Sequence, residues 1–462
     1  MLKYKKYGRI LDNDFAALIP EWWAWETLRE MMPKLVVLPM VNRDYNDSFA
    51  QAGDVVNLHR IDGFTAKRKF KGEPIVMQAA TATYDDIRLN QHIHTSFLLD
   101  EVDERSTFPE LSAKYIPKAA EALANGIDQV IMGEAYQFHA QAAGKIGLTA
   151  ADTDARLLDL REHFQRRNIP NAGRQLIVGP STDKLLLDTP RFVEAQMVAD
   201  MAATGAIRNG FLGRARGFNV NEVSNASEIA AGQTTSTAAI NQSGGFLRGT
   251  STLVVNGITG TLTLGSWCFI AGDDLPHRIV AQTGNPNTTG ITISPGLFKP
   301  VAHTAAITIM TPGTVNHPTT GTYAFQYGKE IKYTGLSVHP QVGQGVSFGN
   351  SDVVYTVMAV DTGDSLMLLN RPLDAAVAHG DAVCLLPYGN YNMAIVKDAI
   401  TFVNRPLAPA VEGVRSANAA FAGVALRVTI GYDMTYMRRM ITLDTLCAVK
   451  TLDRRLGGMF VS

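Results

Sequence analysis

The spacing of apolar residues changes character several times along the chain. Between residues 53 and 99, two runs alternate apolar and polar residues and are rich in β-branched side chains, VVNLHRIDGFTA and IVMQAATATYDDIRLNQHIHTSFLL. This alternation predicts a long two-stranded hairpin. The longest helical pattern covers residues 106–143. In the run after Pro117, through Gly144, the spacing of apolar residues is four and three, which predicts an amphipathic helix. A helix of about 25 residues would be roughly 38 Å long. Its apolar stripe is Ile116, Ala120, Leu123, Ile127, Val130, Ile131 and Phe138.

Residues 152–225 alternate between the two periods. The run DTDARLLDLREHFQRRNIP predicts a second amphipathic helix that ends at Asn168 and Pro170. RQLIVGP then reads as a short buried strand, STDKLLLD as a short helix and FVEAQMVAD as another helical segment. After residue 390 mixed character returns, and RVTIGYD and RMITLDTLCAVKTL predict two strands joined by a short turn.

From about Ala226 to Leu386 the chain is rich in Thr, Gly, Ser, Val and Ile and has no helical period, which predicts an all-β insertion. It contains an internal repeat: ITISPGLFKPVAHTAAI aligns without gaps to MLLNRPLDAAVAHGDAV, which places His303 opposite His379. Upstream, HRIVAQTG matches YTVMAVDTG with one inserted residue, and WCFIAG and VSFGN begin the two copies. The repeat predicts a duplicated module, either within one larger barrel or as two small domains.

Near the N-terminus, Pro20 followed by EWWAWETLREMM predicts a helix, because proline suits the first turn and Glu21 complements the helix dipole. Trp22, Trp23 and Trp25 give this helix a large apolar surface. Two interpretations remain open: the tryptophans dock on the core of their own subunit, or they anchor the helix to a neighbour, since aromatic residues are enriched at interfaces.

Cations are concentrated at the tip of the predicted hairpin, where Lys67, Arg68, Lys69 and Lys71 lie in the sequence AKRKFKGEP. They form either a solvated turn or a contact with acidic surface elsewhere. The densest acidic run, and the candidate partner, comprises Asp100, Glu101, Asp103 and Glu104.

Overall charge changes the picture little. The 462 residues carry a net charge of -1, without the basic excess of a nucleic-acid binder. Charged residues make up 18%, below the roughly 25% of an ordinary domain, which fits either a large core or surface buried between subunits.

Three scattered cysteines indicate a reducing compartment. Because the sequence shows no signal-peptide pattern and no apolar run long enough to cross a membrane, we expect cytosol-like surroundings.

No motif predicts catalysis. His92 and His94 would share one face of a strand, but no third ligand accompanies them, so we interpret them as solvent-facing rather than as a metal site. We interpret the two histidines of the repeat, His303 and His379, as residues at matching strand ends of a duplicated element. Gly210 and Gly213 do not lie between a strand and a helix, which argues against a dinucleotide loop. We therefore expect a protein that is not an enzyme and that has no catalytic, cofactor-binding or metal site.

Five segments, in this order, resemble the coat proteins of tailed bacteriophages: NIPNAGRQLIVGP, IRNGFLGRARGFNVNEVSN, GSWCFIAG, NMAIVKDAITFVNRPLAP, and LRVTIGYD with LDTLCAVKTLDRRLGG. The chain looks most like the branch typified by the coat protein of the Salmonella short-tailed phage, in which a β domain is inserted into the Hong Kong phage capsid fold. That resemblance implies an α+β fold. One departure is that the module containing GSWCFIAG usually occurs once, whereas the repeat indicates two copies.

The resemblance also implies an organisation. The expected segments are an N-terminal arm (1–50), an extended-loop hairpin that reaches over a neighbour (51–100), a peripheral domain with the spine helix (101–170), the first part of the axial domain (171–225), the inserted β domain (226–388) and the return strands of the axial and peripheral domains (389–462). The implied function is a major capsid protein that self-assembles into an icosahedral head shell around double-stranded DNA.

The implied partners are copies of the chain itself, as hexamers and pentamers, together with a scaffolding protein, a portal and decoration proteins. Packaged DNA would be contacted only weakly, no membrane would be involved, and the protein would be located in the virion after assembly in the host cytoplasm. The rivals are a bacterial encapsulating nanocompartment, a secreted β-domain binding protein and an enzyme.

Overall fold

The structure is a computed structural model that describes residues 19–44, 55–61, 64, 66–72, 74–75, 77–78, 82–89, 91–100, 108–189, 213–230, 233, 235–258, 262–283, 289–316, 329–408, 414–434 and 438–462. The chain divides into two compact units. The first lies within Met1–Leu35, Arg43–Ile127 and Val403–Ala448, and the second within Val36–Asn42, Asp128–Phe402 and Val449–Ser462. Predictions for residues 1–18 and for the helical segment FVEAQMVAD fall outside the described residues.

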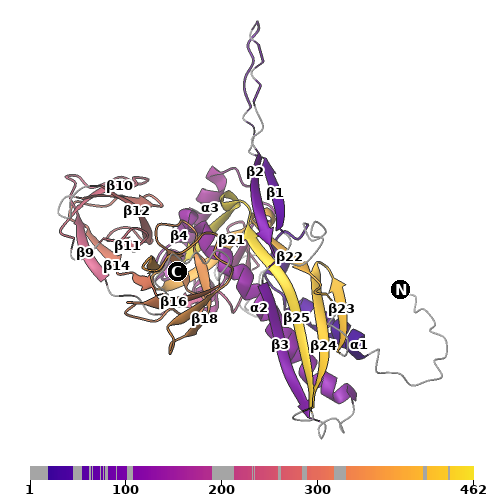
Figure 1. The fold of residues 1–462 in the computed structure, drawn as a ribbon. Coiled ribbons are helices and arrows are strands. Elements are labelled where there is room, and N and C mark those ends of the chain that lie inside the picture. Colours follow the sequence, from indigo (N-terminus) through magenta and orange to yellow (C-terminus); the bar gives the residue numbers. More distant parts are fainter. Residues whose placement is uncertain are drawn as a thin grey trace, which may run out of the picture. The chain divides into compact units, whose positions relative to one another are not determined.

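A five-stranded sheet dominates the first unit (Figure 1). Its strands run in the order β22, β25, β24, β23, and β3 also pairs with β25. The bounds are β3 Gln91–Asp100, β22 Ile400–Arg405, β23 Arg415–Phe421, β24 Val424–Asp433 and β25 Arg438–Thr451. The predicted antiparallel pairing of RVTIGYD with RMITLDTLCAVKTL is confirmed as β24 and β25.

The predicted hairpin is shorter than its alternation indicated. β1 (Val55–Ile61) pairs with β2 (Ala82–Arg88) as a separate two-stranded sheet. The end of the predicted second arm forms β3, whose partner is β25 and not β1. The prediction of one continuous arm was wrong because an alternating pattern specifies a strand and its faces but does not identify its partner.

The helix α1 (Ile19–Met31) and most of α2 (Phe108–Met132) belong to the same unit. α1 begins where Pro20 predicted and packs on β23 and β24. α2 begins two residues inside the predicted helical pattern of residues 106–143. Pro109 occupies the first turn, the position that proline favours. The predicted apolar stripe is buried at Ile116, Ala120, Leu123 and Ile127.

The predicted α-helix to Gly144 instead gives way to a long 3-10 helix, η5 (Gly133–Gln141), in the second unit. Contacts distant in sequence hold this segment. The Thr356 hydroxyl donates to the Gly133 carbonyl at 2.7 Å, and the Gln137 amide donates to the Val354 carbonyl at 2.5 Å. Because 3-10 helices rarely exceed three or four residues, the amphipathic spacing could not predict this geometry.

The second unit is built on a mixed sheet in the order β4, β26, β21, β5, β7, β6, with β8 also paired to β21. The strand bounds are β4 Ala142–Gly144, β5 Gln175–Val178, β6 Arg214–Ala215, β7 Phe218–Glu222, β8 Ser227–Ile229, β21 Gly389–Ile395 and β26 Gly457–Val461. α3 (Ala150–Arg166) buries Leu157, Leu160 and Phe164 in the core. The short helix α4 (Pro180–Leu187) follows β5, as predicted.

The all-β region consists of two closed six-stranded barrels (Figure 1). The first is formed by β9 Thr235–Ile240, β10 Thr252–Asn256, β11 Trp267–Ile270, β12 His277–Thr283, β13 Thr289–Ser294 and β14 Ala306–Met310. The second is formed by β15 Gly313–Val315, β16 Glu330–Thr334, β17 Gly345–Phe348, β18 Tyr355–Asp361, β19 Leu366–Leu369 and β20 Ala382–Leu385. Corresponding strands follow the same cyclic order, so the repeat forms two barrels rather than one. The α+β class with an added all-β region is confirmed.

The two barrels share their irregularities as well as their strand order. The register shifts between Ile279 and Ala281 in β12, and between Val357 and Ala359 in β18. The Gly265 N–H donates to the Ile279 carbonyl at 2.8 Å, and the Gly343 N–H donates to Val357 at 2.7 Å. A conserved bulge and a matching turn are what duplication of one folding module produces.

Candidate assembly surfaces

The segment between β1 and β2 carries the predicted basic tip, and nearly all of its described residues are exposed. Figure 1 draws it as a narrow continuation of the two strands. Its exposed cations are Lys67, Arg68, Lys69 and Lys71. We call the described residues of 64–78 the finger.

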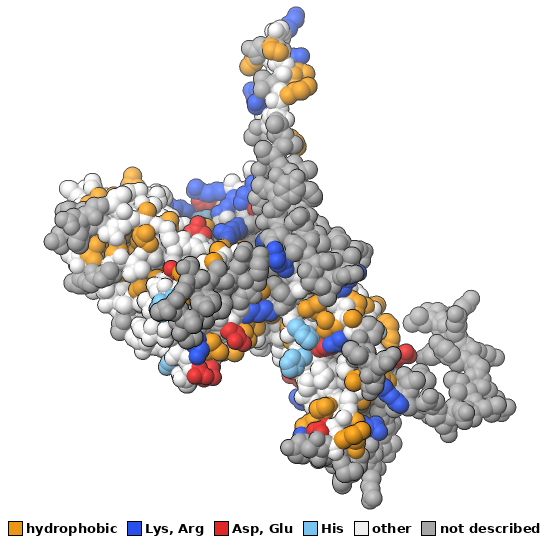
Figure 2. All heavy atoms as spheres, viewed as in Figure 1, with side chains coloured by type: hydrophobic (Ala, Val, Ile, Leu, Met, Phe, Trp, Pro, Cys, Tyr) orange, Lys and Arg blue, Asp and Glu red, His pale blue; other side chains and the backbone are white. Residues whose placement is uncertain are grey.

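The finger also exposes large apolar side chains, which the sequence reasoning did not single out. Phe64 and Phe70 are each 65% exposed, Ile75 is 72% exposed and Met77 is 92% exposed. In Figure 2, orange and blue side chains alternate along it. Isolated exposed apolar residues are ordinary, but four of them on one narrow element leave a large apolar area in water. Such an element is typical of a segment that becomes buried against a partner.

A second apolar surface lies on α1. Trp22, Trp25 and Phe421 are 43%, 54% and 59% exposed, respectively. They line a groove of about 420 Å³ together with the remaining lining residues, Glu26, Leu28, Arg29, Met32 and Pro33. We call this the α1 groove. It is nearly all apolar, and a pocket of this size can hold a bulky side chain.

Phe421 reaches the groove because the connection between β23 and β24 is tight. Phe421 pairs directly with Val424, and the two turn residues, Ala422 and Gly423, have φ values of 50° and 82°. Two successive positive φ values define the two-residue hairpin turn that matches strand twist. The Arg43 guanidinium donates to the Ala422 carbonyl at 2.7 Å. The turn therefore holds Phe421 beside α1.

The three tryptophans of α1, Trp22, Trp23 and Trp25, differ in burial. Trp23 is 1% exposed, and its ring centroid lies 6.0 Å from that of Phe97. The prediction that Trp23 touches a neighbouring subunit does not fit this position, because successive helix residues point in different directions and Trp23 faces its own sheet. Trp22 and Trp25 are partly exposed, so their predicted contact with a neighbouring subunit stays a prediction.

The acidic run lies at the edge of what the structure describes. Asp100 is the last residue of β3 and pairs in register with Arg438. The Asp100 side chain is outside the described part, and so are Glu101, Asp103 and Glu104. Their predicted contact with a basic tip therefore stays a prediction.

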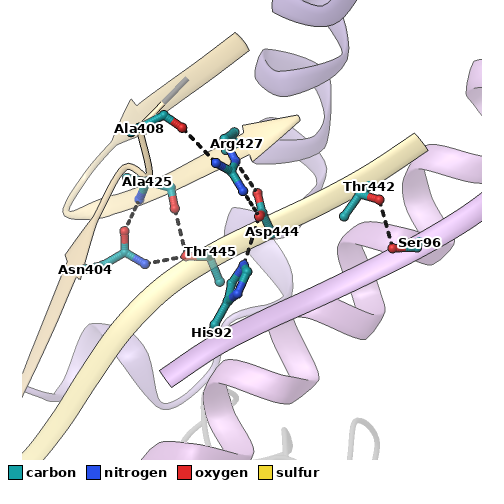
Figure 3. A network of polar contacts seen from close by, with 9 residues as sticks. All are labelled: His92, Ser96, Asn404, Ala408, Ala425, Arg427, Thr442, Asp444 and Thr445. Carbon is teal, nitrogen blue, oxygen red and sulfur yellow. Dashed lines mark hydrogen bonds and ion pairs between the residues drawn. The ribbon is translucent and has the colours of Figure 1, made fainter. Parts of the chain in front are cut away.

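A polar network unites three strands of the first unit (Figure 3). The buried Asp444 carboxylate on β25 accepts a hydrogen bond from Nε of Arg427 on β24 at 3.0 Å. It also lies 2.9 Å from Nε2 of His92 on β3. Beside it, the Asn404 amide donates to the Thr445 hydroxyl at 2.5 Å. The sequence reasoning missed this network, whose signal was a charged residue among apolar neighbours in each of two strands, Arg427 in β24 and Asp444 in β25.

The histidines of interest each have a structural explanation. His92 contacts Asp444, as above, and its ring centroid lies 6.2 Å from that of His94. His303 and His379 are exposed, and each precedes a residue with positive φ, Thr304 or Gly380. They occupy the same turn of the two barrels. In the part of the chain that the structure describes, no group of three or more His, Cys, Asp or Glu side chains could hold a metal ion.

One ion pair with a buried arginine and one buried imidazole lie where the barrels meet η5. Arg278 of the first barrel is fully buried and donates to Asp352 of the second at 2.7 Å. Nearby, His139 packs edge-on against Trp267, with ring centroids 5.7 Å apart. Burial, the dominant effect, together with Arg454 and Arg278 lowers the pKa of His139 to about 4. These groups join parts of the second unit.

Comparison with known proteins gives the following picture. No family model matches the sequence, and no curated protein matches it. Among solved structures, a chain from Mycobacterium phage Che8 is 12% identical with a TM-score of 0.45, covering 92% of this chain and 90% of that one. The capsid of cyanophage P-SCSP1u is 10% identical with a TM-score of 0.42, covering 89% and 84%. A virus-like particle from Pyrococcus furiosus is 12% identical with a TM-score of 0.27, covering 63% and 92%.

Several of the similar structures are thus phage capsids. Within the described residues, none of the helices has the length and apolarity needed to cross a membrane.

Proposed function

We propose that this chain is the major capsid subunit of a tailed bacteriophage and that copies of it assemble into the icosahedral shell that encloses double-stranded DNA. The observation that carries the proposal is the finger, a narrow element that exposes four large apolar side chains and four cations. Burying each apolar side chain in a partner would contribute about 1.5–3 kcal/mol. The chain therefore carries a ready-made joining element.

The proposed assembly is of the chain with itself. A finger on one surface and an acceptor on another make a heterologous contact, and such contacts close into rings when the rotation permits. Hexamers and pentamers are rings of this kind. Individual contacts need only be weak, because each subunit makes several at once and the effective concentration of the later ones is high.

The proposed segments follow the resemblance. Residues 1–50 would form an arm, 51–100 the extended loop, 101–170 the peripheral domain with the spine helix, 171–225 the first part of the axial domain, 226–388 the insertion and 389–462 the return strands. The overall arrangement would be the Hong Kong phage capsid fold, in the branch of the Salmonella short-tailed phage coat protein. A scaffolding protein, a portal and decoration proteins would be its partners, with the virion its final location and the host cytoplasm its place of assembly. Packaged DNA would be contacted only weakly, and no catalytic step is part of the proposal.

The two barrels would stabilise the subunit. Support comes from the hydrogen bonds by which the second barrel holds η5, including that of the Tyr136 hydroxyl to the Gly343 carbonyl at 2.7 Å. Deleting residues 247–387 should lower both the folding yield and the particle yield. Unchanged yields of both would refute this role.

Electron microscopy of the purified full-length protein tests the central proposal. Shells, tubes or aberrant polymers are expected, with light scattering as an independent measure of size. A protein that remains monomeric over a wide concentration range would refute it. An encapsulating nanocompartment, which is also a shell of one repeated subunit, is the rival to be tested. Mass spectrometry of particles from the native host would separate the two, since a nanocompartment would hold an enzyme and a capsid would hold DNA.

A further inference from the structure

The finger and the α1 groove have complementary chemistry. The finger presents Phe64, Phe70, Ile75 and Met77, all at least 65% exposed. The groove is lined by Trp22, Trp25, Phe421 and other mainly apolar residues. Both surfaces have an unfavourable exposed apolar area that their contact would remove from water. Aromatic residues in a groove are also the usual anchors of a protein interface.

Charge adds to the match. α1 carries three glutamates, Glu21, Glu26 and Glu30, against one arginine, Arg29. Arg29 pairs with Glu26 and lies 3.6 Å from Glu30, so Glu21 is the carboxylate on this helix that this pairing leaves unneutralised. The finger has four cations. A positive finger approaching an acidic helix is favoured at long range, and this attraction increases the rate of encounter.

The finger and the groove of a single chain do not occupy each other. Phe70 at 65% and Trp25 at 54% exposure are both open to solvent within the same subunit. The finger of the same chain is thus not the occupant of the groove, and a second copy of this chain offers a segment with matching apolarity and opposite charge.

We propose that the α1 groove of one subunit receives the finger of a neighbouring subunit. This inference rests on the proposed function and adds to it the identity of the two contacting surfaces. The apolar residues of the finger lie in the groove beside Trp25 and Phe421, and its lysines and Arg68 face the glutamates of α1. The contact is heterologous, so each subunit gives one finger and accepts one.

Cysteine cross-linking of assembled particles tests the contact directly. The native cysteines, Cys268, Cys384 and Cys447, are all buried, so they should compete little with introduced surface thiols. The Phe70→Cys and Phe421→Cys variants are mixed, assembled and oxidised. We expect an interchain disulfide between the two variants on non-reducing gels, with at least tenfold less product in particles that contain either variant alone.

The matched control places the acceptor cysteine elsewhere. Leu247 is 78% exposed and precedes a turn of the first barrel, so Leu247→Cys offers an accessible thiol that does not line the groove. Cross-linking of Phe70→Cys to Leu247→Cys at the same rate as to Phe421→Cys would overturn the inference. So would the absence of any Phe421 cross-link in well-formed particles.

A second measurement avoids dependence on disulfide geometry. Trp25→Ser should raise the protein concentration needed for assembly by roughly tenfold or more, since anchors in interface pockets contribute most of the binding energy. Circular dichroism identical to that of the wild type would show that the subunit folds. Normal assembly of a folded Trp25→Ser variant would overturn the inference while leaving the capsid function standing. A wild-type chain that never assembles would overturn both.

Discussion

Asp444 and Arg427 face each other across the antiparallel pair of β25 and β24, where the carboxylate receives the guanidinium Nε at 3.0 Å and Nη2 at 2.5 Å. Asp444 is buried, with its side chain 3% exposed, whereas Arg427 is only partly covered. The two-pronged geometry satisfies both carboxylate oxygens, and His92 adds a third partner. This pairing links three strands of one sheet through a single carboxylate.

Replacing that carboxylate should be costly. We expect Asp444→Asn to lower the free energy of unfolding by about 3 kcal/mol, because it leaves the Arg427 charge without its partner. Removing both charges with Arg427→Met and Asp444→Leu should cost less than Asp444→Asn alone. Urea unfolding followed by circular dichroism would measure both. The exposed Asp364→Asn is the control and should change stability by less than about 0.5 kcal/mol.

The turn beside the α1 groove offers a stabilising substitution. Ala422 has a φ of 50°, a conformation that costs a residue with a Cβ about 1–2 kcal/mol. Ala422→Gly should therefore raise the unfolding midpoint, with a net gain of about 1 kcal/mol at most after the entropy cost of glycine. The opposite change at the next position, Gly423→Ala, should destabilise the turn, because Gly423 has a φ of 82°. If both variants changed stability in the same direction, this explanation of the turn would be wrong.

The spacing and type of neighbouring residues predicted those elements that depend on neighbouring residues alone. The amphipathic spacing of residues 152–167 and the Pro20 start gave α3 and α1, and the repeated VAH motif predicted the duplication seen in the two barrels. The basic tip could be found in the same way, because consecutive cations need no fold to be recognised.

Features set by distant contacts could not be predicted. β3 pairs with β25, so that Gln91 lies opposite Cys447, and no local pattern encodes this partner. The α1 groove needs Phe421 from β23 beside Trp25, and Trp23 is buried because a sheet formed mostly by later residues covers it. The 3-10 geometry of η5 likewise depends on Thr356 and Val354 of the second barrel. Each is a consequence of tertiary packing rather than of propensity.

Stability should fall in mild acid through His139. Its pKa is lowered to about 4 by burial and by Arg454 and Arg278, whereas the unfolded chain has a value near 6.5. Between these two pH values the unfolded state binds more protons than the folded state. The stability that neutral His139 contributes is therefore present above about pH 6.5 and is lost as the pH falls toward 4. The contribution is on the order of 3 kcal/mol. His139→Gln should flatten this part of the stability curve, and an unchanged curve would contradict the assignment.

Asp128 should act in the opposite direction. Its carboxylate accepts the Val36 and Val37 N–H groups at 2.9 and 3.3 Å, yet burial dominates and raises its pKa to about 6 from 3.8. The folded state therefore holds its proton more tightly, and the stability from this group is full below about pH 4 and lost as the pH rises through 6. Asp128→Asn should remove that loss, so that the unfolding midpoint at pH 7 rises relative to the midpoint at pH 5 when compared with the wild type. Midpoints that keep the wild-type spacing would show that Asp128 does not titrate in this range.

Reversing the charge of the finger should block assembly without unfolding the subunit. We expect the triple variant Lys67→Glu, Arg68→Glu and Lys69→Glu to yield folded protein and few particles, because all three side chains are exposed in the free subunit and would meet acidic surface in a neighbour. Sedimentation measures particle yield, and circular dichroism measures folding. Normal shells from the triple variant would refute the charge contact.

Compensating reversals then identify the acidic partner. If α1 is the partner, changing Glu21, Glu26 and Glu30 to lysine should restore particles to the triple variant. If the run of Asp100, Glu101, Asp103 and Glu104 is the partner, only lysines at those four positions should do so. The attraction is electrostatic, so wild-type assembly should also weaken as salt rises, since exposed charges are screened over about 10 Å at 0.1 M salt. Particle yield that did not change between low and high salt would show that the apolar residues of the finger, and not its cations, drive the contact.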